Sequence, residues 1–135
     1  MKTYSNLSDA LRYVLEELSP RGHKYIVDVR GPDGMSAGQF VAECMVYGGN
    51  CTALALFLAF DTTCESKSVE LERFQACQVF PLFEYKPWQD IPCYASRFGL
   101  DVSNALRVYW QVASRIYYNA DSMVLECTVH DEGPA

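Results

Sequence analysis

The sequence lacks a long apolar segment and the short motifs that mark common enzyme classes. Its longest uninterrupted apolar run, Ala53–Phe60, is far shorter than the roughly 20 residues needed to span a bilayer, so we predict no membrane helix. The chain has no glycine-rich dinucleotide or Walker motif, no GxSxG nucleophile motif and no HExxH zinc motif. We therefore predict a protein that is not an enzyme and holds no cofactor.

Closely spaced metal-ligand pairs are also absent from the sequence. The six cysteines include no CxxC pair, and the two histidines, His23 and His130, are isolated. A structural zinc site usually needs two such pairs, so we predict no metal. The N-terminus is polar and acidic where a secretory signal would be apolar, which predicts a cytoplasmic protein with reduced thiols. The cysteines are Cys44, Cys51, Cys64, Cys77, Cys93 and Cys127.

Basic residues are outnumbered, with 11 Lys and Arg against 17 Asp and Glu, and the formal net charge is −6 at pH 7. Such a surface repels nucleic-acid phosphates and anionic lipids. We therefore predict a protein partner with a basic surface, and neither nucleic acid nor a membrane. The length of 135 residues and the lack of a linker-like stretch predict a single domain over residues 1–135.

Helical and strand periodicities both occur, which predicts a small α+β domain. We expect an N-terminal helix capped by Asn6 or Ser8 and a mainly antiparallel sheet of about three to four strands. A C-terminal helix pair is expected over residues 91–98 and 102–118, followed by a final strand over 123–129 and a polar tail. The stripe expected to be buried on the second helix is Val102, Leu106, Tyr109, Ala113 and Ile116.

The middle of the chain is less regular. Residues 24–30 alternate as in a strand, and the apolar residues 52–60 predict a central strand buried on both faces. Residues 36–47 fit either a helix or a strand, and we predict a helix. Residues 69–83 alternate imperfectly and predict a strand, with a helix as the alternative over 69–80. Turns or polar connections are expected over residues 31–34, 48–50 and 61–68.

The expected C-terminal helix pair has the spacing of a helix-turn-helix, with Ala95 four residues before Gly99 and a second helix after it. Polar side chains on the second helix would then point outward, as contacts with DNA require. Residues 86–119 carry a net charge of +2. A DNA-binding regulator is therefore an alternative function. Its candidate DNA contacts are Asn104, Arg107, Gln111 and Arg115.

A cysteine nucleophile activated by His23 or His130 is the second alternative. Neither histidine forms a local motif with a cysteine. Cys64 lies in the most polar stretch of the chain and is expected to be the most accessible thiol. Lys67 would lower the pKa of this thiol and Glu65 would oppose that effect.

Aromatic residues are abundant, and they include nine tyrosines and two tryptophans. Tyr and Trp frequently anchor protein interfaces. We therefore predict a small acidic protein-binding module that modulates or inhibits a larger partner. By analogy of size and charge, one form is a phage- or plasmid-borne counter-defence inhibitor of the anti-CRISPR or anti-restriction type, since an acidic surface can occupy a basic groove. The candidate interface residues are Tyr85, Trp88, Tyr117 and Tyr118.

Overall fold

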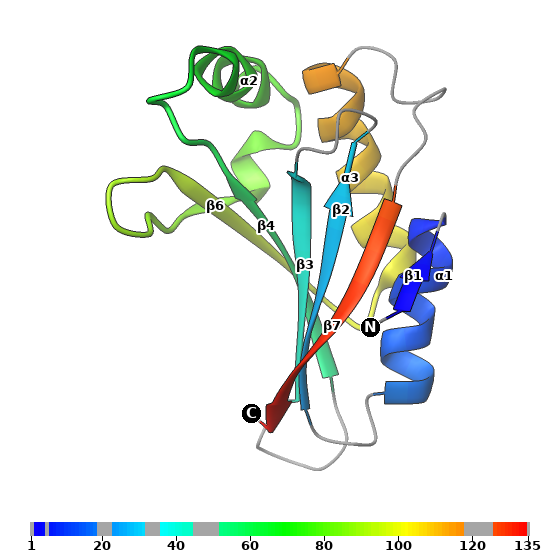
Figure 1. Cartoon of the computed structure of the whole chain (residues 1–135). Helices are drawn as coiled ribbons and strands as arrows, with labels where there is room; N and C mark the ends of the chain where they lie inside the picture. Colours follow the sequence, from blue (N-terminus) through cyan, green and yellow to red (C-terminus); the bar gives the residue numbers. More distant parts are fainter. Residues whose placement is uncertain are drawn as a thin grey trace.

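The described residues fold into one antiparallel sheet and three α-helices (Figure 1). The computed structural model describes residues 2–4, 6–18, 23–31, 36–44, 52–117 and 126–134. The strands are β1 (Lys2–Tyr4), β2 (His23–Arg30), β3 (Ser36–Cys44), β4 (Thr52–Ala59), β5 (Glu84–Tyr85), β6 (Cys93–Gly99) and β7 (Glu126–Pro134). In this described part of the chain they form one seven-stranded sheet in the order β1-β7-β2-β3-β4-β6-β5, and each neighbouring pair is antiparallel.

Hydrogen bonds from backbone amides to polar side chains begin two of the helices. The Asp9 amide donates to Asn6 Oδ1 at 3.2 Å, and the Asn104 amide donates to Asp101 Oδ1 at 3.0 Å, so both termini are capped. No helix in the described ranges is long and apolar enough to cross a membrane. The helical segments are α1 (Leu7–Tyr13), its π-helical continuation η1 (Val14–Leu18), α2 (Glu65–Gln75), the 3₁₀ turn η3 (Phe80–Leu82) and α3 (Val102–Tyr117).

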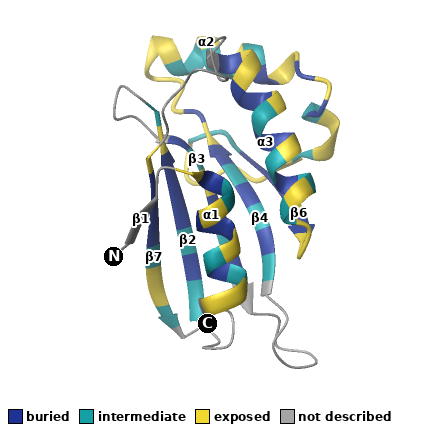
Figure 2. Ribbon diagram, turned by 90° about the vertical axis from the view of Figure 1, so that its right-hand side faces the viewer, coloured by how far each residue is buried: buried dark blue, intermediate teal, exposed yellow. Residues whose placement is uncertain are grey.

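The main core lies between one face of the sheet and the helices α1 and α3 (Figure 2). Alternate residues of β3 and β4, such as Phe40 and Leu56, are fully buried on this face, as the two-residue period of a strand requires. Burying one such aliphatic or aromatic side chain stabilises the fold by roughly 1.5–3 kcal/mol. The largest fully buried side chains are Tyr25, Tyr109, Phe40, Phe74, Leu11, Leu54, Leu56, Val14, Val27, Val29, Val108 and Val112.

An aromatic cluster fixes α2 against the end of the sheet. The ring of Phe74 on α2 stacks on Phe60 at a centroid distance of 5.3 Å and meets Tyr94 of β6 edge-on at 5.2 Å. Arg73 Nη1 donates to the Ile116 carbonyl at 2.9 Å, which ties α2 to the C-terminal turn of α3. These contacts place α2 next to the end of β4, where Lys67 and Glu70 line the same pocket as Ala59.

A β-bulge separates the start of β3 from β4. Over the same interval β3 contains one residue more than β2, and the extra residue lies at Ala37–Gly38. Gly38 has φ +122°, a backbone conformation that favours glycine. The described ladder between β3 and β4 begins only with the pair Gln39 and Phe57. Ala37 and Gly38 are therefore not paired with β4, and the sheet is open at this point.

Several expected elements are confirmed. The N-terminal helix with its Asn6 cap, the strand expected over 24–30 and the helix expected over 102–118 match α1, β2 and the described part of α3. The strand expected over 52–60 is β4, an inner strand, although its second face is not buried, since Ala53, Ala55 and Phe57 are half-buried and Ala59 is exposed.

Other expectations are wrong. Residues 36–44 form strand β3 and not a helix, because Phe40 and Ala42 alternate toward the core. Helix α2 covers residues 65–75, where the end of a polar connection was expected up to residue 68 and a strand from residue 69, because this segment is mostly polar and buries Phe74 against the aromatic cluster. The imperfect apolar alternation there does not correspond to a sheet face.

The prediction of a first helix in the C-terminal pair, over residues 91–98, is also wrong. Residues 93–99 form strand β6, in which Tyr94, Ser96 and Phe98 are buried and Arg97 is exposed. Gly99 does adopt a left-handed conformation, with φ +58°, but it is the last residue of a strand and not the cap of a helix. The sheet has seven described strands, more than the three to four expected, because β3 and β6 were expected as helices and because β1 and β5 are too short for periodicity to reveal.

The final strand is confirmed with shifted bounds. β7 runs through the polar residues 130–134 that were expected to form a tail, because they pair with the start of β2. Residues 123–125 of the expected strand lie outside the described residues, as do 32–34 and 48–50 of the expected turns.

Candidate functional site

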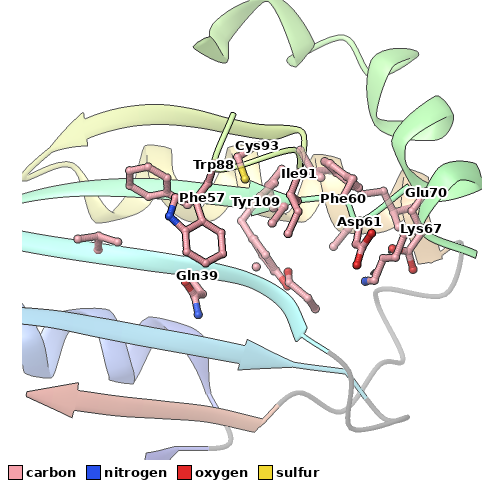
Figure 3. A pocket seen from close by; sticks show the side chains of 18 of the residues that line it. Gln39, Phe57, Phe60, Asp61, Lys67, Glu70, Trp88, Ile91, Cys93 and Tyr109 are labelled. Carbon is pink, nitrogen blue, oxygen red and sulfur yellow. Dashed lines mark hydrogen bonds and ion pairs between the residues drawn. The ribbon is translucent and has the colours of Figure 1, made fainter. Parts of the chain in front are cut away.

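A pocket of about 580 Å³ lies where β3 and β4 separate (Figure 3). It opens on the face of the sheet opposite α1 and α3, because Gln39, Val41 and Phe57 alternate with the buried residues Phe40 and Leu56. The opening in the ladder lets the pocket reach α3, which supplies its floor. A volume of this size lies within the range of roughly 300–1,000 Å³ that is typical of ligand pockets.

Most of the pocket lining is apolar. Tyr109 crosses the floor, and its hydroxyl donates to the Ala37 carbonyl at 2.9 Å. This hydrogen bond satisfies a buried carbonyl that the bulge removes from the β3–β4 ladder. The apolar lining residues are Ala37, Gly38, Val41, Phe57, Leu58, Ala59, Phe60, Trp88, Ile91, Cys93, Tyr109, Val112, Ala113 and Ile116.

The Trp88 loop, which we define as residues 86–92, forms one wall of the pocket. The Trp88 amide donates a hydrogen bond to the Ile91 carbonyl at 3.1 Å, and the Ile91 amide donates to the Trp88 carbonyl at 3.0 Å. The Lys86 amide donates to the Cys93 carbonyl at 2.8 Å. Gln89 takes φ +54° in the turn between them, an uncommon conformation for a residue with a side chain. The loop is thereby held in place, and Trp88 stays 64% exposed although it lines the pocket.

Charged side chains gather at the other end of the pocket, beside α2 (Figure 3). Lys67 Nζ lies 2.9 Å from Glu70 Oε2, and these side chains are only 15% and 18% exposed. Asp61 Oδ1 accepts bonds from Thr63 Oγ1 at 2.6 Å and from the Thr63 amide at 3.1 Å. The hydroxyl bond, followed by the amide bond, lowers the pKa of Asp61 below its ordinary value. Asp61 is therefore a carboxylate at neutral pH.

The side chains of two of the four predicted interface residues belong to the described part of the structure. Trp88 lies at the pocket, and Tyr85 lies on the neighbouring strand β5, 56% exposed, with its ring 5.2 Å from that of Tyr94. Tyr117 is the last residue of α3, and its side chain lies outside the described set. Tyr118 lies outside the described residues altogether.

The candidate DNA contacts lie on the solvent-facing side of α3. Arg107, Gln111 and Arg115 are exposed and Asn104 is half-buried, and Arg107 Nη2 donates to Asn104 Oδ1 at 2.7 Å. Because residues 93–99 form strand β6, α3 is not the second helix of a helix-turn-helix.

Neither candidate histidine base is bonded to a described cysteine thiol. His23 Nδ1 lies 2.9 Å from Asp131 Oδ1, and His130 is half-buried on β7. In the described residues no hydrogen bond joins a histidine to a cysteine, and no three His, Cys, Asp or Glu side chains gather as a metal site requires.

Sequence reasoning missed most of the residues that make up the pocket. Lys67 and Glu70 have the i,i+3 spacing of a helical ion pair, and that signal was available in the sequence. Phe57 looked like an ordinary strand residue, and Asp61 like a loop residue. Only tertiary structure brings these residues together with Trp88.

Comparisons of the chain with protein-family models, curated proteins and solved structures find no match in any of the three.

Proposed function

We propose that the protein is a non-enzymatic binding module that modulates or inhibits a larger partner protein, and that Trp88 anchors the contact. The observation that carries this proposal is the position of Trp88, which is 64% exposed at the edge of a mostly apolar pocket of about 580 Å³. An exposed indole beside a preformed pocket has the composition of an interface hot spot. Two further apolar side chains, Leu82 and Tyr85, are 54% and 56% exposed shortly before the Trp88 loop in the chain.

The charge of the chain supports a basic partner surface. With a net charge of −6, association with a basic protein is accelerated by electrostatic attraction. An inhibitor that occupies the nucleic-acid groove of a defence protein is one form of this function. The positions of the candidate catalytic groups also agree with a binding role, since His23 is bonded to Asp131 and the Cys64 thiol to Ser66.

The proposal is tested by affinity capture from the source lysate with the wild-type protein, Trp88→Ala and Leu100→Ala as baits. Leu100 is 61% exposed and does not line the pocket, so its variant is the matched control for losing an exposed apolar side chain. We expect the wild type and Leu100→Ala to capture the same protein, with affinity reduced roughly 30-fold in Trp88→Ala, as for a hot-spot residue. Equal capture by all three baits, or turnover in a hydrolase screen, would contradict the proposal.

A further inference from the structure

The pocket has an apolar end and a charged end. Trp88, Phe57 and Ile91 lie toward one end, and Asp61, Lys67 and Glu70 lie beside α2 at the other (Figure 3). A single occupant that fills the pocket therefore meets both an apolar surface and ionised groups.

The charged end contains one carboxylate that is available to a ligand. Lys67 is bonded to Glu70 at 2.9 Å, so these two charges largely neutralise each other. Asp61 accepts both of its bonds from Thr63 on Oδ1, and among the described residues Oδ2 accepts none. Asp61 is an exposed residue that lines the pocket, and an ionised carboxylate in such a position favours a cationic hydrogen-bond donor.

The chain segments around this end carry an excess of negative charge. Residues 61–90, which include α2 and most of the Trp88 loop, contain six acidic and three basic residues, a net charge of −3. This excess attracts a cationic ligand at long range, whereas the charged residues that line the pocket itself balance, because Lys24 of β2 and Lys67 stand against Asp61 and Glu70.

We propose that the pocket binds a segment of the partner protein in which an apolar residue is followed by an arginine. The apolar side chain packs against Trp88 and Phe57, and the guanidinium donates to Asp61 Oδ2. Arginine fits this site because its guanidinium stays charged and presents several donors, one of which can bond Oδ2 while the others remain hydrated. This inference rests on the proposed function, and it specifies which chemistry of the partner the site recognises.

The test uses three N-acetylated dipeptide amides, Leu-Arg, Leu-Gln and Leu-Glu, titrated into the ¹⁵N-labelled full chain and followed by NMR. We expect saturable shifts of the Trp88 indole and of the Ile91 and Asp61 amides. The arginine peptide should bind about three- to fivefold more tightly than the glutamine peptide, which is the strength of an exposed ion pair. The glutamate peptide should bind most weakly. Absence of shifts at pocket residues up to about 10 mM peptide, a concentration that detects even millimolar affinity, would overturn the proposal.

Charge variants separate the role of Asp61 from general attraction. In Asp61→Asn, whose amide oxygen can still accept the bonds from Thr63, the preference for the arginine peptide should disappear while the glutamine peptide binds as before. Glu17→Gln removes one exposed negative charge on η1, which does not line the pocket, and should keep the preference. If Asp61→Asn keeps it too, the arginine site is wrong. The proposed binding function is judged separately, by the capture experiment with Trp88→Ala.

Discussion

At the scale of single residues, Cys64 differs from the other described cysteines in exposure and hydrogen bonding. It is exposed, whereas Cys77 and Cys127 are buried. Its Sγ lies 3.1 Å from Ser66 Oγ, and this bond, together with backbone amides of Lys67 and Ser66, lowers the pKa of the thiol. Burial, by contrast, raises the pKa of Cys127 to about 11. The sequence predicted that the Lys67 ammonium would lower the pKa of Cys64, but this ammonium forms an ion pair with Glu70.

We predict that alkylation of the folded protein at about pH 8 modifies Cys64 first and Cys127 only after unfolding, because the thiolate is the reactive form. The modified sites are identified by mass spectrometry of quenched samples. In Ser66→Ala the Cys64 pKa should rise, so the midpoint of its rate against pH should move upward. Modification of Cys127 at the rate of Cys64 in the folded protein would refute this prediction.

At the scale of elements, the bulge in β3 determines whether the pocket exists. Gly38 has φ +122°, and a Cβ at this position would lie 3.1 Å from Leu58 Cδ2 and 3.4 Å from Tyr109 Cε1. Gly99 also has a positive φ, of +58°, but an added Cβ would meet no atom within 4 Å. The two glycines therefore share a conformational requirement and differ in packing.

Gly38→Ala should lower the free energy of unfolding by about 2–4 kcal/mol, because backbone strain and overpacking add. Gly99→Ala, the matched control, should cost only about 1–2 kcal/mol for its left-handed backbone. Urea denaturation followed by circular dichroism measures both values. Equal losses in the two variants would mean that contact with Leu58 and Tyr109 does not restrict β3.

The errors in predicting elements have a common physical cause. The spacing of apolar residues does not distinguish strand β6 from a short amphipathic helix. Tyr94 and Phe98 are four residues apart, and this separation puts two side chains on the same face of either a helix or a strand. Pairing with β4 and β5 decides for the strand. The sequence of α2 is rich in the strong helix formers Glu, Lys, Leu and Arg, which favour a helix. The imperfect apolar alternation nevertheless led to the prediction of a strand. α3 was predictable since its apolar stripe continues over 16 residues.

At the scale of the whole molecule, the acidic charge and the fold both argue against DNA binding. α3 presents Arg107 and Arg115 to solvent but has no preceding helix to cross the DNA backbone, since β6 takes that place. We predict no retardation of duplex DNA in a gel even at about 50 mM salt, where phosphate contacts are strong. Retardation that weakens in Arg107→Ala and Arg115→Ala would instead support the regulator.

The sequence by itself determined the α+β composition, the capped N-terminal helix, the amphipathic α3, the inner strand β4 and the exposure of Trp88 and Cys64. These features depend on interactions between residues close in the chain, or on local polarity, and both leave periodic or compositional signals. The net charge, and with it the expected sign of the partner surface, also follows from composition alone.

Only the tertiary structure decided the strand order and the pocket. β7 lies between β1 and β2, so segments from the two ends of the chain are paired, and no local pattern encodes such a pairing. The pocket needs the bulge at Gly38, the floor from α3, Asp61 at the end of β4 and the Trp88 loop in one place. Its shape depends on packing between residues far apart in the chain, and for that reason the sequence singled out Trp88 as a candidate interface residue but did not predict the pocket.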